Sequence, residues 1–344
     1  MRKFFIFVST VIVLTQLIWS APGIAQTIPR DQAVRPHRWD GGRGTLFFGV
    51  GLLQRSSRPI RSYSSDGTQR GSDIDVFKDL PNLRKVVVED LAAGPNGTTA
   101  IACVLNFGST VQHVVLTYGA SGELRSILDT EPYFPHAITI DDDGTIFVLG
   151  ERMDKSKGDS AYPLVVKYGS DGKVAGQLLL SSSFRSGAEA IEKSERDDAE
   201  ASIMFRDGKL YVYAPTENEI LVCTTSGVVL HRLRLDGVLD DIARKDRVKR
   251  AGIRNVSFMD PNKIVLELIE YSGSQVKAER VFGRGPGMHP VAYLVNLQTA
   301  YYKLVARGEM STKWVFIGTR GNELLTLNSD GQEHAITSHV VSEN

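Results

Sequence analysis

The chain has 344 residues, with 40 basic and 40 acidic side chains, 42% hydrophobic residues and two cysteines. This charge balance gives no reason to expect nucleic acid or an anionic membrane surface as a partner. Two cysteines exclude a disulfide-dense scaffold, and the length suits one large closed β domain as well as two ordinary domains.

The N-terminal segment has the features of a secretory signal peptide. Arg2 and Lys3 precede an apolar run that ends near Trp19, and small residues lead up to Ala25. The run is short for a membrane-spanning helix, so we expect cleavage after Ala25 rather than an uncleaved anchor. Removing residues 1–25 leaves 38 basic against 40 acidic residues, a net charge of −2. The expected location is periplasmic or secreted, with no membrane span after cleavage.

A strand–turn–strand unit then returns about six times between residue 44 and the C-terminus. Its clearest copy is FPHAITIDDDGTIFVLG (134–150), followed by PLVVKYGSDGKVAGQLLL (163–180). Gly or Asn in the tight turns suits the positive φ that a hairpin requires. These turns are GRG (42–44), PNG (95–97), DDG (142–144), RDG (206–208), DPN (260–262) and, more weakly, MST (310–312).

A second marker follows most turns, namely a third strand that ends in a hairpin into a fourth. The markers are SYSSDG (62–67), TYGASG (117–122), KYGSDG (167–172), VCTTSG (222–227) and LNSDG (327–331). In the fifth copy, VAYLVNL (291–297) and AYYKLV (300–305) take these two strand positions. Four short strands in each unit predict an all-β fold, a six-bladed β-propeller of four-stranded antiparallel blades.

The predicted propeller is a single domain over residues 26–344. Its blades span about 36–80, 86–130, 134–181, 200–236, 251–306 and 308–341. Seven blades are less well supported, because 181–200 does not read as strands. The first blade lacks an obvious inner strand, which either 33–39 or 336–341 could supply. Cys103 and Cys223 fall in apolar strands of separate blades, so we expect two buried thiols rather than a disulfide.

The copies resemble the NHL type of six-bladed propeller, whose blades begin P-x-G-I-A-V-D and continue through D-G-x-I-Y-V. The third blade carries the resemblance best, in PHAITID (135–141), and the last blade fits in WVFIGTRGNELLTLNSDGQ (314–332). The resemblance spans almost the whole mature chain and implies the fold. It implies no single activity, because this architecture hosts unrelated binders, lyases and hydrolases.

Long connections are expected on one face only, where the central channel has its mouth. They are GLLQRSSRP (51–59), 151–163, 181–201 and 271–290, whereas the opposite face has mostly tight turns. Loops that lengthen on one face are where function is commonly placed, although neutral insertions would give the same pattern.

The candidate site residues share one position, eight residues before the last residue of the tight turn. They are Glu89, His136, Glu200 and Arg254, in four consecutive blades. Equivalent positions converge in a propeller, so we expect these side chains to form a ligand-binding site at the channel mouth. The alternative is that they pair with one another and with channel water.

Two functions remain open, and whether the protein is an enzyme is uncertain. The first is an exported ligand- or protein-binding propeller that takes a small ligand, a peptide or an envelope protein. The second, suggested by the resemblance, is a channel-mouth hydrolase, lactonase or lyase with His136 as acid/base or metal ligand. Glu89 and Glu200 would then act as bases or ligands, and Arg254 would hold an anion.

No cofactor and no metal site are predicted. A divalent metal held by the histidine and the carboxylates is the alternative, and the positive charge of Arg254 argues against it. We expect a monomer.

Overall fold

The computed structural model describes residues 26–29, 37–153, 163–180, 183, 202–214, 219–245, 250–260, 262–271, 288–299, 301–307, 314–328 and 333–341. The predicted signal peptide lies outside these residues. None of the helices that the structure describes is long and apolar enough to cross a membrane.

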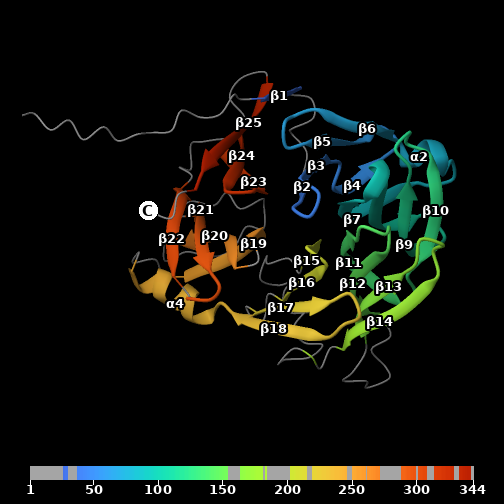
Figure 1. Cartoon of the computed structure of the whole chain (residues 1–344). Helices are drawn as coiled ribbons and strands as arrows, with labels where there is room; N and C mark the ends of the chain where they lie inside the picture. Colours follow the sequence, from blue (N-terminus) through green and yellow to red (C-terminus); the bar gives the residue numbers. More distant parts are fainter. Residues whose placement is uncertain are drawn as a thin grey trace, which may run out of the picture.

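Six antiparallel sheets surround a central axis and form a six-bladed β-propeller, as predicted (Figure 1). Blade 1 contains β2 (His37–Asp40), β3 (Thr45–Phe48), β5 (Ile60–Ser64) and β6 (Gln69–Ile74). Blade 2 contains β7 (Lys85–Ala93), β8 (Thr99–Asn106), β9 (Val111–Tyr118) and β10 (Leu124–Asp129). Blade 3 contains β11 (Tyr133–Ile140), β12 (Ile146–Arg152), β13 (Pro163–Tyr168) and β14 (Val174–Leu180).

The remaining blades complete the ring. Blade 4 contains β15 (Ser202–Arg206), β16 (Lys209–Ala214), β17 (Glu219–Thr224) and β18 (Val229–Arg234). Blade 5 contains β19 (Arg250–Asp260), β20 (Lys263–Tyr271), β21 (Met288–Asn296) and β22 (Tyr302–Arg307). Blade 6 contains β23 (Trp314–Arg320), β24 (Glu323–Asn328), β25 (Glu333–Val340) and β1 (Gln26–Pro29). The first-named strand of each blade lies nearest the axis (Figure 1).

The described residues form six apolar core clusters, one between each pair of neighbouring blades. Strand β12 shows why the sequence produces them. Ile146 and Val148 face blade 2, whereas Phe147 and Leu149 face blade 4. Successive side chains of a strand point to opposite faces, and both faces of a blade are covered by neighbours, so the strand is apolar throughout.

Blade 6 differs from the sequence prediction by one strand. The pattern predicts 314–320 as a second strand after a turn at 310–312. In the structure this segment is β23, the innermost strand, and the tight turn that follows it lies at 321–322. The unit is shifted because its fourth strand comes from the other end of the chain. Strand β1 pairs with β25, from Gln26 opposite Ile336 to Pro29 opposite Glu333, and closes the ring.

Blade 1 and its first connection also clarify the sequence prediction. The inner strand is β2, from the first of the two candidate segments, whereas 336–341 belongs mostly to β25 of blade 6. The predicted 51–59 loop begins with a further strand, β4 (Gly51–Gln54), which pairs with the first half of β7. Blade 2 therefore has a fifth strand on its inner edge, near the channel mouth.

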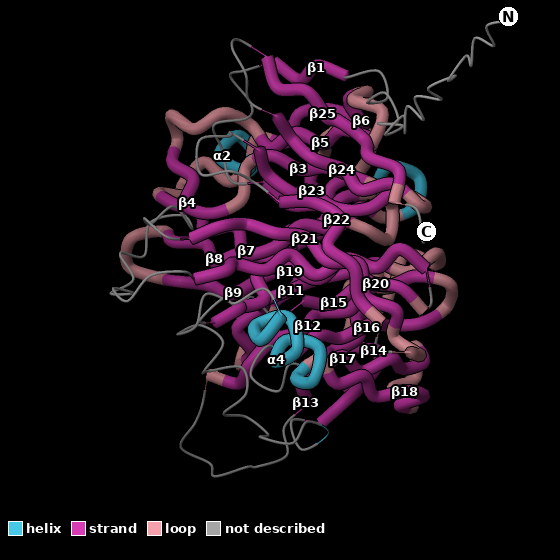
Figure 2. The backbone as a smooth tube through the Cα atoms, turned by 90° about the vertical axis from the view of Figure 1, so that its left-hand side faces the viewer, coloured by secondary structure: helices cyan, strands magenta, loops and turns pink. Residues whose placement is uncertain are grey.

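Two helices of the described part of the chain lie outside the blades. Helix α2 (Val76–Asp79) follows β6, and its N-cap Asp75 accepts from the backbone N–H groups of Phe77 and Lys78. Helix α4 (Asp236–Lys245) lies on the outer side of the ring (Figure 2). Its Val238, Leu239 and Ile242 join the apolar cluster between blades 4 and 5, which the sequence reading did not anticipate.

Both cysteines are free and buried, as predicted. Cys103 lies in the cluster between blades 1 and 2, and Cys223 in the cluster between blades 3 and 4. Burial raises the pKa of the Cys223 thiol to about 11 and that of Cys103 further. Both side chains are therefore protonated, inert core residues at neutral pH.

Candidate functional site

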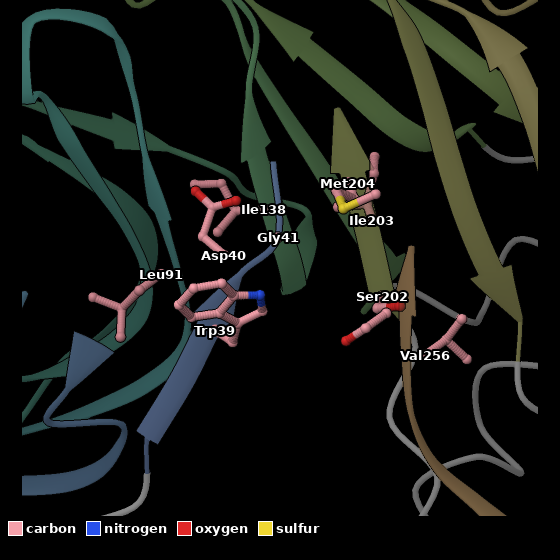
Figure 3. Close-up of a pocket in the computed structure, with 10 residues that line it drawn as sticks. Trp39, Asp40, Gly41, Leu91, Ile138, Ser202, Ile203, Met204 and Val256 are labelled. Carbon is pink, nitrogen blue, oxygen red and sulfur yellow. The ribbon is translucent and has the colours of Figure 1, made fainter. Parts of the chain in front are cut away.

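A small pocket lies on the propeller axis (Figure 3). Strands β7, β11, β15 and β19 line it with Leu91, Ile138, Ser202 and Val256, and the end of β2 completes the wall. Its cavity volume is about 30 Å³, whereas one water needs roughly 10–15 Å³. The pocket therefore has room for about two or three water-sized groups.

The predicted residues precede the pocket by a constant offset. Each stands two positions before a pocket residue on the same chain segment: Glu89 before Leu91, His136 before Ile138, Glu200 before Ser202 and Arg254 before Val256. The described lining includes neither Glu89 nor His136. The innermost strands begin at the mouth, so Glu89, His136 and the backbone of Arg254 lie closer to the mouth than the pocket does.

Three of these positions coincide with a β-bulge in the innermost strand. The pairing of β7 with β8 shifts between Val88 and Asp90, so Glu89 is the extra residue. The same shift occurs around His136 in β11 and around Arg254 in β19. A bulge bends the strand and redirects its side chains, and such bulges are common beside binding sites. The fourth position, Glu200, lies outside the described residues.

His136 is packed within its own blade and against its neighbour. Its Nε2 lies 3.7 Å from Oε1 of Glu151 in β12, and the two side chains are 13% and 15% exposed. The Phe134 ring lies 4.8 Å from the His136 ring and 5.1 Å from that of His113 in blade 2. Two histidines and an aromatic ring thus join blades 2 and 3 on the mouth side.

The structure describes Glu89 and Arg254 to different extents. Glu89 is half-buried, and its carboxylate is near enough to Cys103 to contribute to the raised pKa of that thiol. The backbone of Arg254 lies in β19, but its side chain is outside the described part of the structure. Convergence of all four side chains therefore stays a prediction.

The opposite end of the channel is crossed by the turn between β2 and β3, residues 41–44. Arg43 of this turn donates to the backbone oxygen of Asp141 at 3.1 Å and to Oδ1 of Asp142 at 2.7 Å, both in blade 3. A Cβ on Gly42 would lie 2.5 Å from the backbone oxygen of Phe205 in blade 4. Only glycine permits this approach. The turn therefore bridges from blade 1 to blades 3 and 4 near the centre of the ring (Figure 1).

Trp39 forms one wall of the axial pocket and packs against blade 6. Its indole reaches so close to Gly318 of β23 that a Cβ there would lie 1.9 Å from Cδ1 of the ring. Trp39 is 8% exposed, and its Nε1 has no hydrogen-bond partner in the described structure. Leaving a buried donor unsatisfied costs about 1–3 kcal/mol.

Side chains of the innermost strands bond to the backbone of the next blade at three successive interfaces. Oδ2 of Asp40 accepts from the N–H of Ala93 at 2.7 Å. Oδ2 of Asp90 accepts from the N–H of Ile138 at 2.9 Å, and Oγ1 of Thr139 accepts from the N–H of Phe205 at 2.9 Å. These bonds fix blades 1 to 4 relative to one another around the pocket.

The sequence reading missed Trp39 and Ser202 as pocket residues. Ser202 could have been found, because it stands two positions after Glu200, as Ile138 does after His136. Trp39 had no such signal, because the register of the first inner strand was open. Within the described residues, no group of three His, Cys, Asp or Glu side chains is arranged to hold a metal ion.

No family model matches this chain. No curated protein matches it either. The resemblance to the NHL type therefore stays a prediction, while the propeller fold itself rests on the arrangement of the sheets.

Similar solved structures exist at low identity. The hydrazine synthase of Kuenenia stuttgartiensis is 12% identical with a TM-score of 0.45, over 86% of this chain and 76% of that chain. A gluconolactonase of Xanthomonas campestris is 12% identical with a TM-score of 0.45, over 92% and 90% of the two chains. BamB of Moraxella catarrhalis is 11% identical with a TM-score of 0.43, over 92% and 89%. At these scores the similarities carry no argument about activity.

Proposed function

We propose that this protein is an exported binding module that holds a ligand or partner at the channel mouth. The observation that carries the proposal is the shared β-bulge at Glu89, His136 and Arg254. Three blades break their innermost pairing at the position that the sequence marks as ionisable. A repeated local distortion costs pairing, so a common role at the mouth is a physical reason for it.

The remainder of the channel supports the mouth as the binding end. The far end is crossed by the 41–44 turn, and the axial pocket holds only a few atoms. A ligand larger than the pocket must make most of its contacts at the channel mouth. Side chains of both charges at that level suit a polar ligand with positive and negative groups.

The location follows from the predicted signal peptide. An exported chain with a net charge of −2 and no expected cofactor fits a module that recognises a small ligand, a peptide or an envelope protein. None of the described contacts favours the hydrolase alternative, which stays a prediction.

The experiment compares two charge-neutralising double variants. Glu89→Gln with Arg254→Gln alters the mouth, and Glu123→Gln with Arg125→Gln alters an exposed ion pair on a hairpin of the opposite face. Purified wild type and both variants are used for capture from native envelope extract and for thermal unfolding with a panel of small polar ligands. A ligand at 100 times its Kd stabilises the folded state by about 2.7 kcal/mol.

We expect the mouth variant to lose captured partners or ligand-induced stabilisation, while the opposite-face variant behaves as wild type. Equal capture and equal stabilisation in all three proteins would overturn the proposal, provided that both variants unfold at temperatures close to that of wild type.

A further inference from the structure

Basic side chains gather on the mouth face, where β4 meets the start of β7. The segments 51–59 and 81–88 contain no acidic residue and four basic ones, Arg55, Arg58, Arg84 and Lys85. Gln54 pairs with Lys85, and Arg55 donates to the backbone oxygen of Pro81, so the two segments lie side by side. We call these four residues the basic cluster. In a chain with equal numbers of basic and acidic residues, this is a local excess of positive charge.

The charge of the basic cluster is turned toward solvent. Arg55, Arg84 and Lys85 are exposed, and in the part of the chain that the structure describes none of the three forms an ion pair. The acidic residues that flank the cluster in the chain, Asp79 and Glu89, are half-buried. The cluster therefore complements a partner that brings its own negative charge.

Strand β4, beside the basic cluster, has an open edge. It is the last strand in the described sheet of blade 2 and pairs with β7 on one side only. Gln54 is bonded to Ser57 through both its N–H and its oxygen, so the open part of the edge is Gly51–Leu53. Leu52 adds an apolar side chain that is 57% exposed. An edge strand offers backbone N–H and C=O groups to another chain.

We propose that β4 and the basic cluster bind an extended acidic segment of a partner polypeptide, which adds a strand to the inner edge of blade 2. Backbone pairing requires a polypeptide in extended form, which a lipid headgroup or a free anion does not supply. The edge has room for one or two backbone bonds, so contact with Leu52 and acidic side chains opposite the cluster supply the remaining affinity. The inference rests on the proposed function, because it takes the mouth as the binding end, and it adds the class of partner.

The probe is a phage-displayed library of random heptapeptides, selected on the immobilised protein at low salt. We expect the enriched sequences to combine at least two acidic residues with a β-branched or other apolar residue. Synthetic copies of these peptides are then titrated against the protein by calorimetry. Their affinity should fall about tenfold from low to high salt, because salt screens exposed charges.

Protein variants locate the peptide. We expect Arg84→Gln with Lys85→Gln to bind it about tenfold more weakly, the effect of losing two exposed ion pairs. Arg125→Gln with Lys173→Gln removes two charges from exposed hairpins of the opposite face and, as the matched control, should bind as wild type. At the edge, Leu52→Glu should weaken binding by charge repulsion, whereas Leu52→Lys should not.

The variants are compared at matched unfolding temperatures. If Arg84→Gln with Lys85→Gln does not fold, Arg55→Gln replaces it. Selected peptides that bind both Leu52 variants and the cluster variant as tightly as wild type would overturn the inference.

Methylation of single backbone nitrogens in the peptide tests the added strand. Paired antiparallel strands bond through alternate residues, so methylation should weaken binding at alternate positions and be tolerated between them. Tolerance at every position would contradict strand addition. A library that yields no acidic peptide would also overturn the inference.

A membrane is the competing partner for a basic cluster. The test uses vesicles of phosphatidylcholine with and without phosphatidylglycerol. Binding to the anionic vesicles that needs Arg84 and Lys85, without selection of any acidic peptide, would assign the cluster to a lipid surface and overturn the inference.

Failure of the proposed function looks different. In that case the mouth variant Glu89→Gln with Arg254→Gln has no effect on capture, while binding of the acidic peptide still depends on Leu52, Arg84 and Lys85.

Discussion

The two ends of the central channel are built from the same innermost strands but serve opposite requirements. Toward the tight-turn end, Asp40 and Thr139 accept from the backbone of the next blade, and the 41–44 turn reaches across the ring. Toward the mouth, β7, β11 and β19 carry bulges at ionisable positions. The comparison teaches that one end fixes the blades in place, and this leaves the other end free to depart from regular pairing.

The largest effect is expected where blades 2 and 3 are joined. Asp90 is 2% exposed, and its oxygens accept from the N–H groups of Leu91 and Ile138, each at 2.9 Å. Asp90→Ala leaves two buried donors without these acceptors, at about 1–3 kcal/mol each. We expect a loss of roughly 2–5 kcal/mol in the free energy of unfolding, measured by chemical denaturation.

The control for Asp90 is Asp171→Ala. Asp171 lies in an exposed hairpin, where it accepts from the N–H of Lys173 at 3.1 Å and lies 3.6 Å from Nζ of the same residue. Its removal should cost less than about 1 kcal/mol. Equal losses in the two variants would contradict the view that side-chain bonds between blades fix the innermost strands.

A smaller effect on stability, with a clear effect on access, is expected for Arg43→Ala. The Arg43 guanidinium is part-exposed, so its bonds to blade 3 contribute about 1 kcal/mol or less. The turn it holds lies against the indole of Trp39. We therefore expect the indole N–H of Trp39 to exchange with solvent several-fold faster in Arg43→Ala, measured by NMR.

Arg61→Ala provides the comparison for Arg43. Arg61 pairs with Asp73 at 2.7 Å on the outer part of the same blade. Its removal should leave exchange at Trp39 unchanged. Faster exchange in both variants would indicate a general loosening of blade 1 rather than opening of the closed end.

The smallest effect concerns pH at the mouth end. Burial lowers the pKa of His113, against the opposing influence of Glu131 and Asp129. A folded-state pKa below the unfolded value of about 6.5 means that the unfolded chain binds more protons as pH falls. The stability that the neutral His113 ring contributes is complete above about pH 6.5 and is lost as the pH falls below that value. We expect thermal stability to fall from pH 7.5 to 5, with a shallower fall in His113→Gln.

The titration of His113 can also be read directly. Its ring proton signals in NMR should titrate below the value for an exposed histidine. A midpoint at or above about 6.5 would remove the mouth-end pH effect from the comparison.

The repeats were predictable because each blade encodes its own turns. The hairpins of blade 3 end at Gly144 and Gly172, with φ of 82° and 79°. These positive values are what the DDG and SDG patterns require. Apolar strands between such turns predict the strand order within a blade, because each strand pairs with the next one in the chain. The same local logic placed Glu89, His136 and Arg254 at one structural position.

What the sequence did not predict depends on contacts far apart in the chain. Strand β4 is four residues long and becomes a strand only because β7 offers it an edge. The shift in blade 6 arises from pairing between residues about 300 positions apart. The direction of the His136 side chain follows from a bulge, which alternation along a strand cannot anticipate. The pocket at Trp39 and Ser202 exists only once five blades meet.

The pairing of β1 with β25 also constrains how the protein is made. Strand β1, the outermost strand of blade 6, is synthesised before the other strands of the propeller. It has no strand to pair with until residues 333–336 have left the ribosome. The propeller ring can therefore close only at the end of translation. Removal of residues 26–29 would leave the last blade with three strands and an unpaired outer edge on β25.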